Sequence, residues 1–178
     1  DFGDLTSARG EPGARGMSPI RGLLAGGITP SNSDIIDFID IATTGNAVDF
    51  GDLTVARRRA TGDSNTTKAV FAGGITPSTQ DVIDTVNIAS LGNAIDFGNL
   101  SAARGFLGAV SNDNRIVFGG GNTGSNVNTM DYVTIVSAGN ATDFGDLNGG
   151  RQGLSATSNG HGGLNAFNPR PPELYSPT

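Results

Sequence analysis

Residues 45–57 read Gly-Asn-Ala-Val-Asp-Phe-Gly-Asp-Leu-Thr-Val-Ala-Arg, and the Asp-Phe-Gly at the centre of this stretch occurs four times in the 178-residue chain. The four copies begin at Asp1, Asp49, Asp96 and Asp143, so they are separated by 48, 47 and 47 residues. Two further markers keep the same interval. Because composition bias does not place three markers in one register, the sequence indicates a tandem repeat of about 47 residues, a length typical of arrays and of β-propeller blades.

The other two markers are a glycine pair and a triplet centred on aspartate, and an arginine follows each Asp-Phe-Gly. The glycine marker stands at Gly26–Gly27, Gly73–Gly74 and Gly119–Gly121. The triplet stands at Ile36–Phe38, Ile83–Thr85 and Met130–Tyr132. The arginines are Arg9, Arg57, Arg104 and Arg151. These markers predict a repeat domain over residues 1–164, with full units at about 9–51, 57–98 and 104–145 and partial units at both ends.

Within one unit, the pattern of apolar residues and turns predicts four short strands. In the middle unit we expect them near 60–62, 68–71, 82–90 and 94–97. The first unit offers a rival interpretation, because Ser33 could cap an amphipathic helix that begins at Asp34. The equivalent segments at Val82 and Met130 are rich in β-branched residues, which disfavour a helix. We therefore expect an all-β fold.

The number of units leaves the closure of this fold open. Closed propellers usually have about four to eight blades, whereas this chain holds three full units and two partial ones. Residues 1–5 could complete the C-terminal sheet as a latch. Otherwise the missing blades come from a longer chain or another copy, or the units form an open stack with exposed strand edges. The chain begins at Asp1 without a methionine, which is expected of a processed product or a part of a longer protein.

Residues 165–178 contain four prolines and predict an extended, polyproline-like arm. Phe167, Leu174 and Tyr175 are apolar side chains of this C-terminal region. We expect them to anchor the arm on a neighbouring subunit.

Composition excludes several classes of function. The chain has 17 acidic and 11 basic side chains, a net charge of −6, and no cysteine. This charge does not suit a nucleic-acid surface, because phosphates are bound by clustered Lys and Arg. No apolar run reaches the ~18 residues that a membrane span needs, so we expect no membrane insertion. Without cysteine, disulfides and thiolate metal sites are excluded.

The sequence also offers no catalytic residues, metal ligands or cofactor site, so we expect no enzyme. Residues 119–124 match the G-x-G-x-x-G of dinucleotide-binding folds, but a predicted strand follows them instead of the required helix. Each unit places only two carboxylates at its Asp-Phe-Gly turn, whereas Ca²⁺ takes about six to eight oxygens. His161 is the single histidine and cannot build a zinc site alone.

Laid out as strands, the unit resembles the kelch repeat of β-propellers. The residues that carry this resemblance are Phe71-Ala72-Gly73-Gly74, Asp131-Tyr132, Asp96-Phe97-Gly98 and Ala103-Arg104. The resemblance extends over residues 1 to about 164, although kelch units usually carry Trp where Phe50, Phe97 and Phe144 stand. It implies a kelch-like β-propeller of four-stranded repeats that is either incomplete or closed by another segment or chain.

The amino-acid sequence of residues 45–57 is similar to tandem kelch-like repeats in structural proteins of marine cyanobacterial phages. That resemblance implies an extracellular virion component, such as a tail-fibre or tail-associated protein, and no enzymatic activity. Its expected partners are other structural subunits or further copies of the chain. The alternative is a subunit of a cellular extracellular filament or cell-surface structure, in which residues 1–5 fill the open sheet edge of the next copy.

The repeated residues are expected to be structural. Gly73, Gly74, Gly120 and Gly121 stand where strands converge or turn, where glycine tolerates close backbone approach. Phe50, Phe97 and Phe144 suit an aromatic plug between neighbouring blades. Arg57 and Arg104 are expected to pair with carboxylates of the Asp-Phe-Gly-Asp segments.

The loops after the glycine marker differ between units and are polar. Such loops suit hydrogen bonding to sugars or proteins on one face of a scaffold, so a cell-surface glycan is one candidate ligand. The alternative is that they are solvated hairpins. The candidate ligand-binding residues are Asn32, Ser33, Ser78, Thr79, Asn122, Thr123, Ser125 and Asn126.

Overall fold

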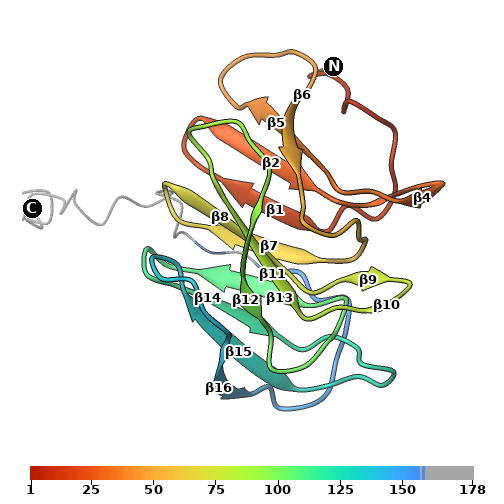
Figure 1. Ribbon diagram of the computed structural model, residues 1–178, viewed down its shortest axis with the longest axis vertical. Helices are drawn as coiled ribbons and strands as arrows, with labels where there is room; N and C mark the ends of the chain where they lie inside the picture. Colours follow the sequence, from red (N-terminus) through yellow and green to blue (C-terminus); the bar gives the residue numbers. More distant parts are fainter. Residues whose placement is uncertain (157, 159–178) are drawn as a thin grey trace, which may run out of the picture.

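The computed structural model describes residues 1–156 and residue 158. Within this part, the protein is all-β, with no helix, three four-stranded antiparallel sheets and two short hairpins (Figure 1). The first sheet has the order β1 (Ala14–Met17), β2 (Arg21–Ala25), β5 (Ile35–Asp40) and β6 (Val48–Asp52). The second has the order β7 (Thr61–Ser64), β8 (Lys68–Ala72), β11 (Val82–Asn87) and β12 (Ile95–Asn99). The third has the order β13 (Gly108–Ser111), β14 (Arg115–Gly119), β15 (Thr129–Thr134) and β16 (Thr142–Asp146).

The prediction of an all-β fold is confirmed, and each full unit of the repeat forms one sheet. The segment that could have been a helix in the first unit forms β5 instead. The sequence did not predict the small hairpins that follow the first two glycine pairs. These are β3 (Ile28–Thr29) with β4 (Ser31–Asn32), and β9 (Ile75–Thr76) with β10 (Ser78–Thr79).

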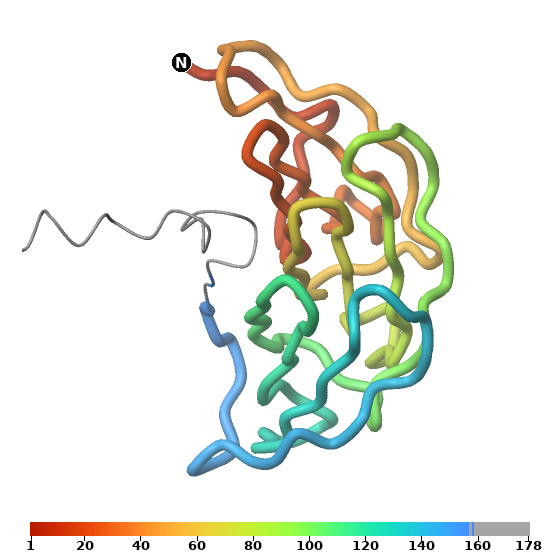
Figure 2. Tube along the Cα trace, turned by 90° about the vertical axis from the view of Figure 1, so that its left-hand side faces the viewer, coloured from red at the N-terminus to blue at the C-terminus, as the bar shows by residue number. Residues whose placement is uncertain are grey.

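The three sheets follow one another face to face along an open curve (Figure 2). The first strand of each unit lies on the inner side of this curve, where β1 contacts β7 and β7 contacts β13. The described residues form no closed ring. Residues 1–5 lie beside the first sheet, where Gly45 N donates to Phe2 O at 2.8 Å, so they do not latch the C-terminal sheet.

Two apolar cores fill the spaces between the sheets. Each core combines the face of one sheet that points towards its successor with the facing side of that successor. Its side chains are largely aliphatic and aromatic, and their burial supplies the main favourable term for stacking. The first core includes Leu23, Ile36, Phe50, Leu53, Phe71 and Ile88. The second includes Val70, Ile83, Phe97, Leu100, Phe118 and Ile135.

Each sheet has a β-bulge at the Asp-Phe-Gly segment. In the second sheet, Ile83 lies opposite Gly98 and Asp84 lies opposite Asp96, which leaves Phe97 as the extra residue of the outer strand. The first and third sheets have the same shift at Phe50 and Phe144. Because a bulge re-aims a side chain, it accounts for the place of Phe97 in the core, where it is 3% exposed.

Hydrogen bonds also join the inner strands of successive sheets. Ser64 Oγ donates to Met17 O at 2.7 Å, and Ser111 Oγ donates to Ser64 O at 2.8 Å. In each pair the two residues are 47 positions apart, so equivalent residues of the repeat meet at the inner edge. These bonds stabilise the order of the stack independently of the apolar cores.

Candidate functional site

A buried ion pair recurs at the start of every sheet. In the second sheet, Arg57 Nη2 lies 3.0 Å from Asp84 Oδ2, and both side chains are fully buried. Thr54, which follows the first sheet, donates its hydroxyl to the other oxygen of Asp84. We call the arginine, aspartate and hydroxyl residue the junction cluster. Its three copies are Arg9, Asp37 and Thr6; Arg57, Asp84 and Thr54; and Arg104, Asp131 and Ser101.

The predicted partner of the arginines was wrong. Asp49, in the Asp-Phe-Gly-Asp segment, is exposed and accepts a hydrogen bond from Gly51 N at 3.1 Å. The aspartate that meets Arg57 belongs to the central strand β11 and lies between two sheets. The sequence did contain the signal, because the middle residue of the Ile36–Phe38 triplet and of its equivalents is aspartate in all three units.

Burial sets the electrostatics of the junction clusters. It lowers the pKa of Arg57 and of Arg104, while the paired aspartates Asp84 and Asp131 oppose this change. The Nε atoms of both arginines have no hydrogen-bond partner. An ion pair in such surroundings depends on both members, since removing one leaves an uncompensated buried charge. The clusters are therefore structural elements of the sheet junctions and offer no opening to a ligand.

The candidate structural glycines lie where the backbone of the next unit passes. A Cβ added to Gly73 would lie 2.5 Å from Arg104 O, and one added to Gly120 would lie 2.7 Å from Arg151 O. Gly74 and Gly121 donate their N–H groups to the same two carbonyls, at 3.0 and 2.8 Å. The glycine pair thus allows the segment that leads into the following sheet to pass closely, and it donates a hydrogen bond to that segment.

The Asp-Phe-Gly glycine packs against a Gly-Asn turn of the next unit. A Cβ at Gly98 would lie 2.4 Å from Gly139 O, and Asn140 Oδ1 accepts a hydrogen bond from Asn99 N at 3.1 Å. The same glycine contact recurs between Gly51 and Gly92. These glycine and asparagine contacts, called the clamp below, join the outer edges of successive sheets, as the serine hydrogen bonds join the inner edges.

Replacing Gly98 with alanine should destabilise the protein by about 2 kcal/mol more than replacing Gly145 with alanine. Both glycines have a positive φ, +146° and +131°, so both variants carry backbone strain. Only at Gly98 would the new Cβ meet backbone atoms, because nothing lies within 4 Å of a Cβ at Gly145. Urea denaturation of the two variants measures the difference, and equal losses would contradict the clamp.

The candidate ligand-binding loops project from one side of the stack (Figure 1). Two of them contain the hairpins β3–β4 and β9–β10, and the third is the segment 122–126, closed by a bridge between Asn122 and Asn126. The exposed members are Ser78, Thr123, Ser125 and Asn126, while Asn32, Thr79 and Asn122 are half-buried.

Ser33 does not belong to this accessible set. It is buried, its Oγ accepts a hydrogen bond from Ile35 N at 3.2 Å, and its carbonyl accepts one from Arg57 N at 3.0 Å. These contacts bring the start of the second unit against the first. Ser33 is therefore a packing residue, whereas the tips of the loops remain open to a ligand.

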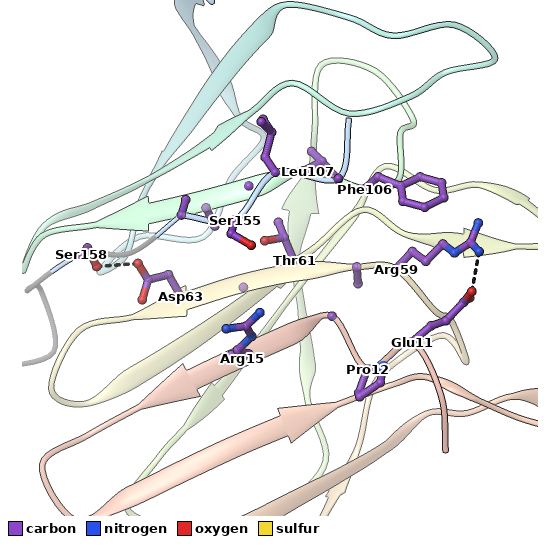
Figure 3. A pocket seen from close by; sticks show the side chains of 18 of the residues that line it. Glu11, Pro12, Arg15, Arg59, Thr61, Asp63, Phe106, Leu107, Ser155 and Ser158 are labelled. Carbon is purple, nitrogen blue, oxygen red and sulfur yellow. Dashed lines mark hydrogen bonds and ion pairs between the residues drawn. The ribbon is translucent and has the colours of Figure 1, made fainter. Parts of the chain in front are cut away.

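A cavity of about 330 Å³ lies at the inner edge, between β1, β7, β13, residues 153–156 and Ser158 (Figure 3). Its polar lining includes Arg15, Thr61 and Asp63, and its apolar lining includes Leu107. Ser158 Oγ donates to Asp63 Oδ2 at 2.6 Å. This cavity could not be predicted from the sequence, because its lining comes from four segments that meet only when the units stack.

One rim of the cavity is formed by an ion pair over an aromatic ring. Arg59 pairs with Glu11, and its guanidinium lies 4.3 Å from the ring centroid of Phe106. The bond from Arg59 lowers the pKa of Glu11. Glu11, Arg59 and Phe106 all have a positive φ, and they occupy equivalent positions of the repeat. The cavity thus has mixed charge, which suits binding of a small polar molecule.

Three further findings concern the described residues alone. They contain no group of three or more His, Asp or Glu side chains that could hold a metal ion. They contain no helix that could cross a membrane. The Pro-rich arm, with Phe167, Leu174 and Tyr175, lies outside the described residues.

The loops, the inner cavity and the junction clusters are the features that distinguish this stack of sheets. The loops and the inner cavity are accessible to a ligand, whereas the junction clusters are buried. Compared with known proteins, the chain matches no family model and no curated sequence.

Proposed function

We propose that the chain is a non-enzymatic virion structural or attachment protein of a phage, in which kelch-like propeller blades carry a variable binding edge. The observation that carries this proposal is the contrast between constant junctions and variable loops. Arg57 and Asp84 have counterparts with the same geometry in each sheet. The loops of the first two units share Ile-Thr-Pro-Ser and the same short hairpin and differ only at Asn32–Ser33 and Thr79–Gln80, whereas the third loop, 122–127, differs at its tip and forms no hairpin strands. A rigid scaffold with changing loops is a common arrangement for recognition.

The proposed ligand is a host-surface glycan or a neighbouring structural protein. Exposed Ser, Thr and Asn side chains at the loop tips offer both donors and acceptors, which hydroxyl-rich ligands require. The net charge of −6 is consistent with a partner other than nucleic acid. The three loops lie on the same side of successive sheets, so they can contact one extended ligand together (Figure 1).

Immunogold labelling tests the place of the protein. Antibodies raised against the purified chain are expected to label phage particles in lysates of the source. Label on cell-surface fibres, with bare particles, would contradict the virion proposal and favour the alternative of an extracellular filament subunit.

The triple variant Thr123→Ala/Ser125→Ala/Asn126→Ala tests the binding edge. We expect it to lose about tenfold or more in affinity for host-cell envelope glycans on an array, because three exposed polar groups are removed. The control is Asp113→Ala/Asn114→Ala, which changes exposed residues of the β13–β14 turn. Binding that both variants retain, or that neither they nor the parent chain shows, would contradict a glycan-binding edge.

A further inference from the structure

The outward face of the third sheet carries the same side chains that the first two sheets bury. Phe50 and Phe97 are 2% and 3% exposed beneath the sheet that follows them, but Phe144 is 50% exposed. Tyr132 packs edge-on against Phe144 at 6.0 Å, as Phe38 packs against Phe50 at 6.1 Å. This face, with Val117, Met130, Tyr132, Phe144 and Leu147, is called the terminal face below.

Beside the terminal face, Arg151 occupies the arginine position of a further, incomplete junction cluster. Arg151 N donates to Val127 O at 3.1 Å, and Arg151 O accepts from Gly121 N at 2.8 Å. Arg57 makes the equivalent two bonds with Ser33 and Gly27. The side chain of Arg151 is exposed, and no carboxylate of the described residues forms an ion pair with it. The backbone is therefore set for a junction whose aspartate is missing from this part of the structure.

The matching aspartate stands in the first sheet. Asp37 is held by Thr6 and Arg9, which belong to residues 1–9, Asp-Phe-Gly-Asp-Leu-Thr-Ser-Ala-Arg. Residues 143–151 read Asp-Phe-Gly-Asp-Leu-Asn-Gly-Gly-Arg and have the same spacing from aspartate to arginine. The two segments thus share the arginine that pairs with a first-sheet aspartate, and differ at the hydroxyl position, where Asn148 replaces Thr6.

From this equivalence we infer that the terminal face binds the first sheet of a second copy of this chain. Residues 143–151 of one copy replace residues 1–9 of the other, and Arg151 takes the place of Arg9 against Asp37. Residues 152–156 of the donor copy, four of which are exposed, give way to β1 of the acceptor. The contact is head-to-tail, so repeated use builds a ring or a filament.

The two halves of the proposed interface match in charge and in their positions within the repeat. The positive charge of Arg151 meets the negative charge of Asp37, and Phe144 enters the position that Phe2 leaves. Phe2 is itself 42% exposed, and of the contacts that its segment gives up, Arg151 restores the buried ion pair with Asp37 that Arg9 makes, while the bond from Thr6 is lost. The occupant is the same kind of sheet that covers the equivalent face at both internal junctions.

Disulfide trapping tests the contact directly, because the chain contains no cysteine. At an internal junction, Asn99 N bonds Asn140 Oδ1, and the equivalent pair between copies is Asp146 with Asn46. Asp146→Cys protein mixed with Asn46→Cys protein should therefore form an intermolecular disulfide. The control partner is Asn93→Cys, which is also exposed. Its neighbour Asp52 stays in place in the proposed exchange, whereas Asp4, the neighbour of Asn46, is displaced with residues 1–9. Equal trapping with both partners would overturn the inference.

Sedimentation equilibrium gives the second readout. The chain of 18.0 kDa should associate as its concentration rises, and Arg151→Ala or Phe144→Ser should weaken association by about tenfold or more. Both residues are exposed, so the variants should keep the parent's β-sheet circular dichroism. A monomeric mass at every concentration would overturn the inference. The proposed virion role supplies the biological setting of this contact and rests on a separate test. A chain that stays monomeric could still be part of the virion and be labelled there.

Discussion

Replacing Arg57 with methionine is expected to lower the free energy of unfolding by about 3–5 kcal/mol. The change leaves the Asp84 carboxylate between two sheets with its bonds to Thr54 but without the cation that lies 3.0 Å away. Methionine fills much of the volume, so the loss reports the unpaired charge more than a cavity. Guanidinium denaturation followed by circular dichroism measures it.

Arg151→Met is the matched control for this prediction. Arg151 has the same place in the repeat and is exposed, so its replacement should change the stability of the monomer by less than about 0.5 kcal/mol. The double variant Arg57→Met/Asp84→Leu should recover much of the loss, because apolar residues can replace a buried ion pair at little cost. If Arg57→Met and Arg151→Met were equally mild, the junction cluster would not hold the sheets together.

The periodic markers predicted the sheets because each marker reports a local requirement. Glycine pairs, β-branched strands and turns act within a few residues, so the number and order of strands follow from them. The partner of Arg57 could not be derived in the same way. Arg57 and Asp84 are 27 positions apart, and only the bulge at Asp84 and the stacking of two sheets bring them together.

The candidate binding site was predicted in part for the same reason. Polar loops after the glycine pair indicated a common edge, and the structure places their tips on one side of the stack. The side chain of Ser33 looks equivalent to its exposed neighbours in the sequence, yet a contact with the next unit buries it. The inner cavity is formed by contacts between units, so no single segment of the sequence could predict it.

Phe97→Ala should destabilise the chain by about 3–5 kcal/mol, the usual cost of removing a buried phenylalanine ring. Phe97 is the bulged residue of the outer strand and is 3% exposed in the core between the second and third sheets. The core also contains Ile83 and Phe118, whose places are fixed by the central strands, so it cannot collapse around the missing ring. Urea denaturation at a protein concentration where the chain is monomeric measures the loss.

Phe144→Ala removes the same ring from the same place in the repeat, but from a face that no described sheet covers. At 50% exposure, Phe144 should contribute about 1 kcal/mol or less, since only the buried part of its apolar area counts. The difference between the two variants therefore measures what one covering sheet adds. Equal losses would mean that the phenylalanines stabilise each sheet by itself, and that stacking contributes nothing through them.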